Sequence, residues 1–129
     1  MKKLLILLFS ILISFNSYSE WTQITQNVYG DVSYVDLQTV KSVSNMRYYY
    51  LLKDYVVPTE WGDLSSKMYQ QINCSTLQAK GLLINYYAEP LGKGSTTEGS
   101  GPNSDAKWIS YPLDSMGHAV HEYICNLKM

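Results

Sequence analysis

Hydrophobic and polar residues alternate with a period of two through much of the chain, the pattern of β-strands with two unlike faces. The strand-like segments are residues 21–26, 32–35, 46–57, 65–74, 80–87 and 107–111. Asp36 is expected to cap a short helical turn that ends at Val40, because its carboxylate can accept the free N–H groups there. The segment from Leu113 to Met129 has helical spacing. The pattern predicts an α+β domain, an antiparallel sheet with this helix across one face.

Segment 46–57 is predicted to be a central strand, because both of its faces are apolar. Its even positions include Met46, Tyr48, Tyr50 and Leu52, and its odd positions include Tyr49, Leu51 and Tyr55. In the next strand we predict that the buried row is Met68, Gln70, Ile72 and Cys74. Residues 89–106 are rich in Gly, Pro and hydroxyl side chains, which predicts a loop.

The closing helix has a wide apolar arc when its residues are placed at about 100° intervals. The predicted buried arc contains Met116, Gly117, Val120, His121, Tyr123, Ile124 and Leu127, with Cys125 at its margin. Gly117 lies near the middle of this arc, where the missing side chain would let the helix approach the sheet closely. We expect His121 to be half-buried and His118 to lie at the surface.

The N-terminus has the pattern of a secretory signal peptide. Lys2 and Lys3 precede an apolar run from Leu4 to Ile13 and a small-x-small site before Glu20. A run of about ten apolar residues is too short to span a bilayer, which takes roughly 20. We predict a signal peptide at residues 1–19 and one mature domain at 20–129. No cysteine stands at the cleavage point, so we expect no lipid anchor. The predicted location is the periplasm, the cell surface or the medium.

Cys74 and Cys125 are the only cysteines, and in an exported chain two cysteines are most simply one disulfide. A bond between them would close a loop of about 51 residues and contribute roughly 4 kcal/mol in the chain-entropy description. In a domain of this size that is a large share of the total free energy of unfolding.

Composition and motifs exclude several functional classes. Removing Lys2 and Lys3 changes the formal charge from −1 to −3, whereas nucleic-acid binders carry a basic patch. In the segment 92–96, Gly94 occupies the position where a phosphate-binding loop needs a hydroxyl. The histidines and cysteines match no standard zinc spacing, and a disulfide removes the thiolates that zinc or a nucleophilic mechanism would use. We therefore predict no catalytic residues, no metal site and no cofactor.

Tyrosine is unusually abundant, with twelve residues in the chain. One interpretation is that they fill the core and form cross-strand pairs. The other is that an exposed sheet face carries aromatic side chains for a protein partner or a second copy of the chain. The candidates by strand parity are Tyr49, Tyr55, Tyr69 and Tyr87.

An ordered series of residues resembles the surface-adhesin protein E family of exported bacterial proteins. The series comprises Trp21, Tyr34-Val35-Asp36, Val40, Arg47-Tyr48-Tyr49-Tyr50-Leu51, Asp54-Tyr55, Ser65-Ser66-Lys67, Cys74, Tyr86-Tyr87, Trp108, Pro112, Ser115 and Cys125. The resemblance covers most of residues 20–129. It implies an antiparallel sheet of about six strands, a C-terminal helix packed on one face, and a disulfide that joins the two.

The resemblance also implies adhesion to host proteins such as vitronectin, laminin and plasminogen, although no ligand-binding segment of the family is matched here. The leading hypothesis is a non-catalytic exported protein-binding domain that uses an aromatic sheet face or the loop at 89–106. The alternatives are a small periplasmic inhibitor, for instance of lysozyme, and a structural envelope protein that dimerises through its sheet.

Overall fold

A computed structural model describes residues 21–97, 101–103 and 105–129. The sheet contains β1 (Thr22–Gln26), β2 (Val32–Val35), β3 (Lys41–Val43), β4 (Met46–Asp54), β5 (Ser65–Asn73), β6 (Gln78–Tyr87) and β7 (Gly101–Pro102). The other elements are the 3-10 helices η2 (Leu37–Thr39) and η3 (Pro90–Gly92) and the helix α2 (Met116–Asn126). The predicted signal peptide lies outside the described residues.

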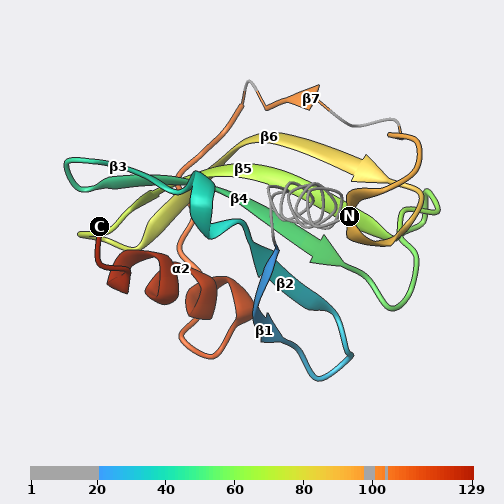
Figure 1. Cartoon of the computed structure of the whole chain (residues 1–129), viewed down its shortest axis with the longest axis horizontal. Coiled ribbons are helices and arrows are strands. Elements are labelled where there is room, and N and C mark those ends of the chain that lie inside the picture. Colours follow the sequence, from blue (N-terminus) through green and yellow to red (C-terminus); the bar gives the residue numbers. More distant parts are fainter. Residues whose placement is uncertain (1–20, 98–100, 104) are drawn as a thin grey trace, which may run out of the picture.

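The described strands form one antiparallel sheet in the order β1-β2-β4-β5-β6-β7, with β3 paired to β4 at one end (Figure 1). Apart from β3, which pairs with β4 alone, described strands that follow one another along the chain are also neighbours in the sheet. The helix α2 lies beside β1 and β2 and finishes near the turn between β5 and β6 (Figure 1). The predicted α+β class, the antiparallel sheet and the C-terminal helix are therefore confirmed.

The edges of the sheet differ from the prediction. Residues 107–111 are not a strand, because they meet β6 only at a bridge between Ile109 and Ala79 before the chain leaves toward the helix. The predicted loop at 89–106 contributes β7 and a bridge from Thr96 to Tyr87. The hairpin strand β3 was also missed, because its three side chains are all exposed and give no hydrophobic pattern.

The core lies between the sheet and α2. Its buried residues are Val35, Val40, Tyr49, Ile72, Ala79, Val120 and Ile124. They come from both halves of the chain, because the strands contribute alternate side chains to this face and the helix contributes one stripe. The prediction that Ile72 and Gln70 belong to the buried row is confirmed.

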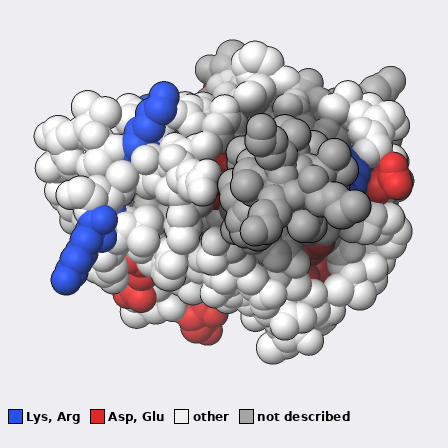
Figure 2. Space-filling view, in the orientation of Figure 1, with Lys and Arg blue, Asp and Glu red and all other residues white. Residues whose placement is uncertain are grey.

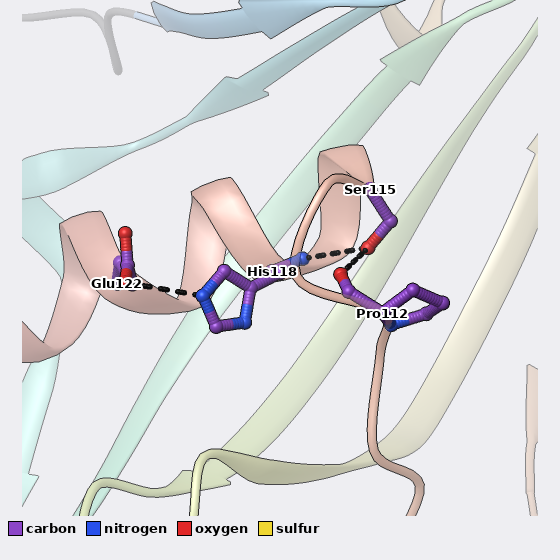
Figure 3. Close-up of polar contacts among 4 residues, drawn as sticks. All are labelled: Pro112, Ser115, His118 and Glu122. Atoms are coloured by element: carbon purple, nitrogen blue, oxygen red, sulfur yellow. Dashed lines mark hydrogen bonds and ion pairs between the residues drawn. The ribbon is translucent and has the colours of Figure 1, made fainter.

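The helix is shorter than its hydrophobic pattern suggested, and its ends explain why. Ser115 caps the first turn by accepting a hydrogen bond from the N–H of His118, and its hydroxyl donates to the carbonyl of Pro112 (Figure 3). At the other end Leu127 has extended backbone. The Arg47 guanidinium donates to the carbonyl of Ile124, which satisfies one of the free acceptors of the last turn.

The disulfide between Cys74 and Cys125 is confirmed, with 5.5 Å between the two Cα atoms. It joins the residue that follows β5 to the last turn of α2. Together with the Arg47 contact, it holds the C-terminal half of the helix against the sheet. Among the described residues, no helix has the length and apolar character needed to cross a bilayer.

Candidate functional site

The strand register places neighbouring residues on opposite faces of the sheet. In the β4–β5 pair, Tyr49 lies opposite Gln70, while Tyr50 lies opposite Tyr69. Because cross-strand partners share a face, the first pair points toward α2 and the second points away from it. We call the side that packs on α2 the covered face. The open face is the opposite side, which carries Tyr48, Tyr50, Lys67, Tyr69, Lys80 and Tyr87.

The four tyrosines predicted to form one exposed surface are divided between the two faces. Tyr69 and Tyr87 lie on the open face. Tyr49 and Tyr55 lie on the covered side, where both line a cavity beneath the helix. The grouping by strand parity is therefore wrong for two of the four. The reason is that both faces of β4 are aromatic, so the alternation alone does not reveal which one the helix covers.

Tyr49 is a core residue with no exposed surface. Its hydroxyl donates to the side-chain oxygen of Gln70 at 2.7 Å, and the ring nitrogen Nε2 of His121 lies 3.2 Å from the same oxygen. Burial raises the pKa of Tyr49 well above its usual value, and the nearby Tyr111 raises it further. These three side chains form a buried polar cluster that links the sheet to α2, so Tyr49 has no part in a surface for partners.

His121 was predicted to be half-buried, and it is more deeply buried than that, with 2% of its surface exposed. Its ring packs edge-on against Tyr111, with 5.1 Å between the ring centroids. Burial lowers the pKa of His121 to about 4, and the proximity of His118 contributes to the same shift. At neutral pH the imidazole is therefore uncharged. Its Nδ1 has no hydrogen-bond partner among the described residues.

Tyr55 lies just beyond the end of β4 and is half-buried. Its hydroxyl and that of Ser66 are 2.9 Å apart and share a hydrogen bond. Burial raises the pKa of Tyr55, and this hydrogen bond partly opposes the shift. The hydroxyl is thus a neutral polar group in the wall of the cavity.

The open face carries a cluster of three tyrosines that come from two strands. The ring centroids of Tyr50 and Tyr69 are 4.6 Å apart, and those of Tyr48 and Tyr69 are 6.2 Å apart with nearly parallel planes. Tyr48 also accepts a hydrogen bond from the amide of Gln71 at 3.1 Å. Partial burial raises the pKa of Tyr69, and its two neighbours add to the shift. Three aromatic rings therefore lie side by side on this face.

Tyr48 and Tyr50 were not among the predicted site residues, although both occupy the even positions of the same strand. The signal that would have found them is the cross-strand register, which pairs Tyr50 with Tyr69. The register between β4 and β5 pairs residues about 20 positions apart, so the pattern of one strand alone does not reveal it.

Two lysines border the tyrosine cluster, and each lies over an aromatic ring. The Nζ of Lys67 is 5.2 Å from the centroid of Tyr87 and 5.9 Å from that of Trp21. The Nζ of Lys80 is 4.5 Å from the centroid of Trp108. Such contacts hold a cation in place while leaving it available to a partner. In the orientation of Figure 2, most of the described surface is uncharged and the charged side chains lie toward its edge.

The titratable side chains of the helix do not assemble a reactive centre in the described part of the chain. His118 Nε2 lies 3.1 Å from the Glu122 carboxylate (Figure 3), and both cysteines are held in the disulfide. No group of three or more His, Cys, Asp or Glu side chains among the described residues is arranged to hold a metal ion.

Comparisons with known proteins agree on one family. The family model of surface-adhesin protein E matches residues 21–126. Crystal form II of Haemophilus influenzae protein E superimposes with a TM-score of 0.63 at 17% identity and covers 84% of this chain and 88% of that chain. The Se-Met form of the same protein gives a TM-score of 0.60 at 18% identity, over 84% and 87% of the two chains. No curated protein matches the sequence.

Proposed function

The chain belongs to the surface-adhesin protein E family, and from this premise we propose that it binds other proteins through the open face of its sheet. Membership assigns it to adhesin-like surface proteins. The finer proposal is that the tyrosine cluster of Tyr48, Tyr50 and Tyr69 contacts the partner, and that the domain acts by binding rather than by catalysis.

The observation that carries the proposal is the position of the tyrosine cluster. These rings do not contribute to the core beneath α2, and 38% of the surface of Tyr50 is exposed. Tyrosine is enriched at the energetic centres of protein interfaces, because it offers a large apolar surface together with a hydroxyl. A stacked group is also already ordered, so a partner loses little side-chain entropy when it binds there.

The borders of the cluster fit the same purpose. Lys67 and Lys80 flank the rings, and each is already held over an aromatic side chain. Charged groups at the rim of an interface mainly influence orientation and association rate, whereas aromatic groups at the centre supply affinity. The proposed partner is therefore a protein surface with an apolar centre and carboxylates at its edge.

The test is a binding measurement with the proteins implied by the resemblance, namely immobilised vitronectin, laminin and plasminogen. Tyr50→Ala and Tyr69→Ala are compared with the wild-type chain. Tyr123→Ala is a matched control, because Tyr123 is also 38% exposed but lies on the helix. We expect either open-face variant to weaken binding by about tenfold or more, the loss typical of a central aromatic residue, and the control to bind as the wild type does.

Two other results would redirect the assignment. Inhibition of a lysozyme by a chain that ignores all three host proteins would favour a periplasmic inhibitor. A dimeric mass in solution that becomes monomeric in Tyr50→Ala, again without binding to host proteins, would show that the open face serves a second copy. Equal loss of binding in Tyr50→Ala and Tyr123→Ala would contradict the open face as the site.

A further inference from the structure

The covered side of the sheet contains two adjoining cavities that the core does not fill. The first, of about 180 Å³, lies between β4, β5 and the start of α2, and the second, of about 260 Å³, lies over β5 and β6. Both are bounded by a common wall of Met68, Gln70, Ile84, Tyr86 and Tyr111. We call the two cavities together the helix-side cleft.

Two glycines make room for the walls of this cleft. A Cβ atom at Gly117 would lie 2.6 Å from the ring of Tyr111, and a Cβ atom at Gly81 would lie 2.9 Å from the sulfur of Met68. Both separations are shorter than ordinary van der Waals contacts. Tyr111 and Met68 can therefore stand where they do only because these two positions lack side chains, and both residues contribute to the common wall.

The lining is mostly apolar, and one part of it groups two hydroxyls with a lysine. Leu51, Met68, Ile84, Ile109 and Val120 supply apolar surface. The hydroxyls of Tyr55 and Ser66 lie at the end that also contains Lys53. Lys53 and Ser66 are cross-strand partners, so their side chains leave the sheet side by side.

Lys53 is the one charged group in the lining of the described cleft. It forms no ion pair with any described residue, and no carboxylate lines either cavity. The cleft therefore combines largely apolar walls with a lysine that forms no ion pair among the described residues, and the nearest hollow that shares this lysine contains Asp114. A concave apolar site with a few convergent polar groups is the usual form of a small-molecule site.

We propose that the helix-side cleft binds a small amphipathic carboxylate, such as a medium-chain fatty acid, with its chain against Met68 and Ile84 and its carboxylate at Lys53. Size supports the assignment, because an apolar cavity of about 150 Å³ is sufficient to bind benzene. The carboxylate would also be within the region of the Tyr55 and Ser66 hydroxyls, which can donate to it. This site is separate from the open face and does not depend on the function proposed for that face.

The test measures octanoate binding by isothermal titration calorimetry. The protein is produced from its full sequence in an expression host that exports it. Octan-1-ol and octylamine provide the same chain with a neutral and a cationic head. We expect octanoate to bind about tenfold or more tightly than octan-1-ol, because charge-assisted hydrogen bonds exceed neutral ones by that order. Octylamine should bind most weakly.

A pair of lysine variants locates the head group. Lys53→Met keeps the apolar stem and removes the charge, and it should lower octanoate affinity to that of octan-1-ol. Lys41→Met is the matched control, since Lys41 is exposed on β3, and it should bind octanoate as the wild type does. Thermal unfolding of each variant shows whether it is folded. The order of affinities of the three probes for the wild-type chain tests the proposal without any substitution.

Methyl NMR spectra then identify the surface that is occupied. Octanoate should shift the signals of Met68 and Ile84. The proposal is overturned if octanoate and octan-1-ol bind equally, if Lys53→Met retains full octanoate affinity, or if the shifts appear at the open face instead. Absence of octanoate binding at millimolar concentration would overturn it as well.

Discussion

The two faces of the sheet use the same strands for opposite purposes. On the covered face Tyr49 has no exposed surface, and its hydroxyl is bonded to Gln70 beneath the helix. On the open face the next residue, Tyr50, is 38% exposed and packs at a tilt against Tyr69. Adjacent tyrosines in one strand thus belong to a core and to a surface.

The difference shows that residue type does not define the role of an aromatic side chain in this fold. The disulfide and the Arg47 contact hold α2 on one side, and every side chain beneath it must pack or find a hydrogen-bond partner. On the other side η3 packs near Asp54 and Ser65 and Leu52 is buried, while Tyr50 stays exposed. The side chains of the two faces therefore differ in how much they contribute to the stability of the core.

The largest expected effect contrasts Tyr49→Ala with Tyr50→Ala. Tyr49→Ala should lower the free energy of unfolding by about 3–5 kcal/mol, because it leaves a cavity in the core and removes the partner of Gln70. Tyr50→Ala should cost about 1 kcal/mol, mainly through the lost ring contact. Urea unfolding followed by far-UV circular dichroism measures both values.

Tyr49→Phe provides the control for that contrast, since it keeps the ring and removes only the hydroxyl. The free energy of unfolding of Tyr49→Phe should lie between those of the two alanine variants. If Tyr50→Ala proved as destabilising as Tyr49→Ala, the open face would have to be covered in solution, and the distinction between the faces would fail.

The second prediction concerns His121, which lies on the covered face among Tyr49, Gln70 and Tyr111. Its pKa is about 4 in the folded chain and near 6.5 in an unfolded one. Between these values the unfolded state binds more protons, so the free energy of unfolding falls as the pH falls. The contribution is constant above about pH 6.5, and the loss reaches about 3 kcal/mol near pH 4.

The measurement is a series of urea unfolding curves from pH 7.5 to pH 4.5 on the wild type and on His121→Gln. The variant should lose less stability than the wild type over this range, because it has no imidazole to protonate. His118→Gln is the control and should retain most of the wild-type slope, since burial, the main cause of the lowered His121 pKa, is unchanged. Parallel slopes for the wild type and His121→Gln would contradict a buried neutral imidazole.

The smallest effect tests how closely the helix approaches the covered face. Replacing a helical glycine by alanine ordinarily stabilises by about 1 kcal/mol. At Gly117, however, the new Cβ would lie 2.6 Å from the ring of Tyr111, and such overpacking costs about 1–3 kcal/mol. Gly117→Ala should therefore be destabilising by about 1 kcal/mol, as measured by urea unfolding.

The effect of Gly117→Ala on stability should change from destabilising to stabilising when the ring of Tyr111 is removed. In a Tyr111→Ala background, Gly117→Ala should stabilise the chain by up to about 1 kcal/mol. If Gly117→Ala stabilised the wild-type chain as well, the close contact between the helix and Tyr111 would be refuted.

The helix illustrates how far periodicity alone can lead. Its pattern correctly predicted that Val120 and Ile124 are buried and that Cys125 lies beside the sheet. It wrongly placed Tyr123 in the buried arc, where the structure leaves it 38% exposed. The helix packs on a narrower stripe than the apolar arc allows, because the disulfide and the Arg47 contact both act on its last turn.

The sequence by itself determined the class of the fold, the disulfide and the family, because these depend on local periodicity, on two cysteines and on an ordered series of residues. A period of two also required that Tyr49 and Tyr50 point in opposite directions. Which of them faces the helix was decided only by the tertiary structure, through pairing with Gln70 and Tyr69 on another strand. The helix-side cleft likewise exists only when β4, β5, β6 and α2 are assembled, since no single segment contains its walls.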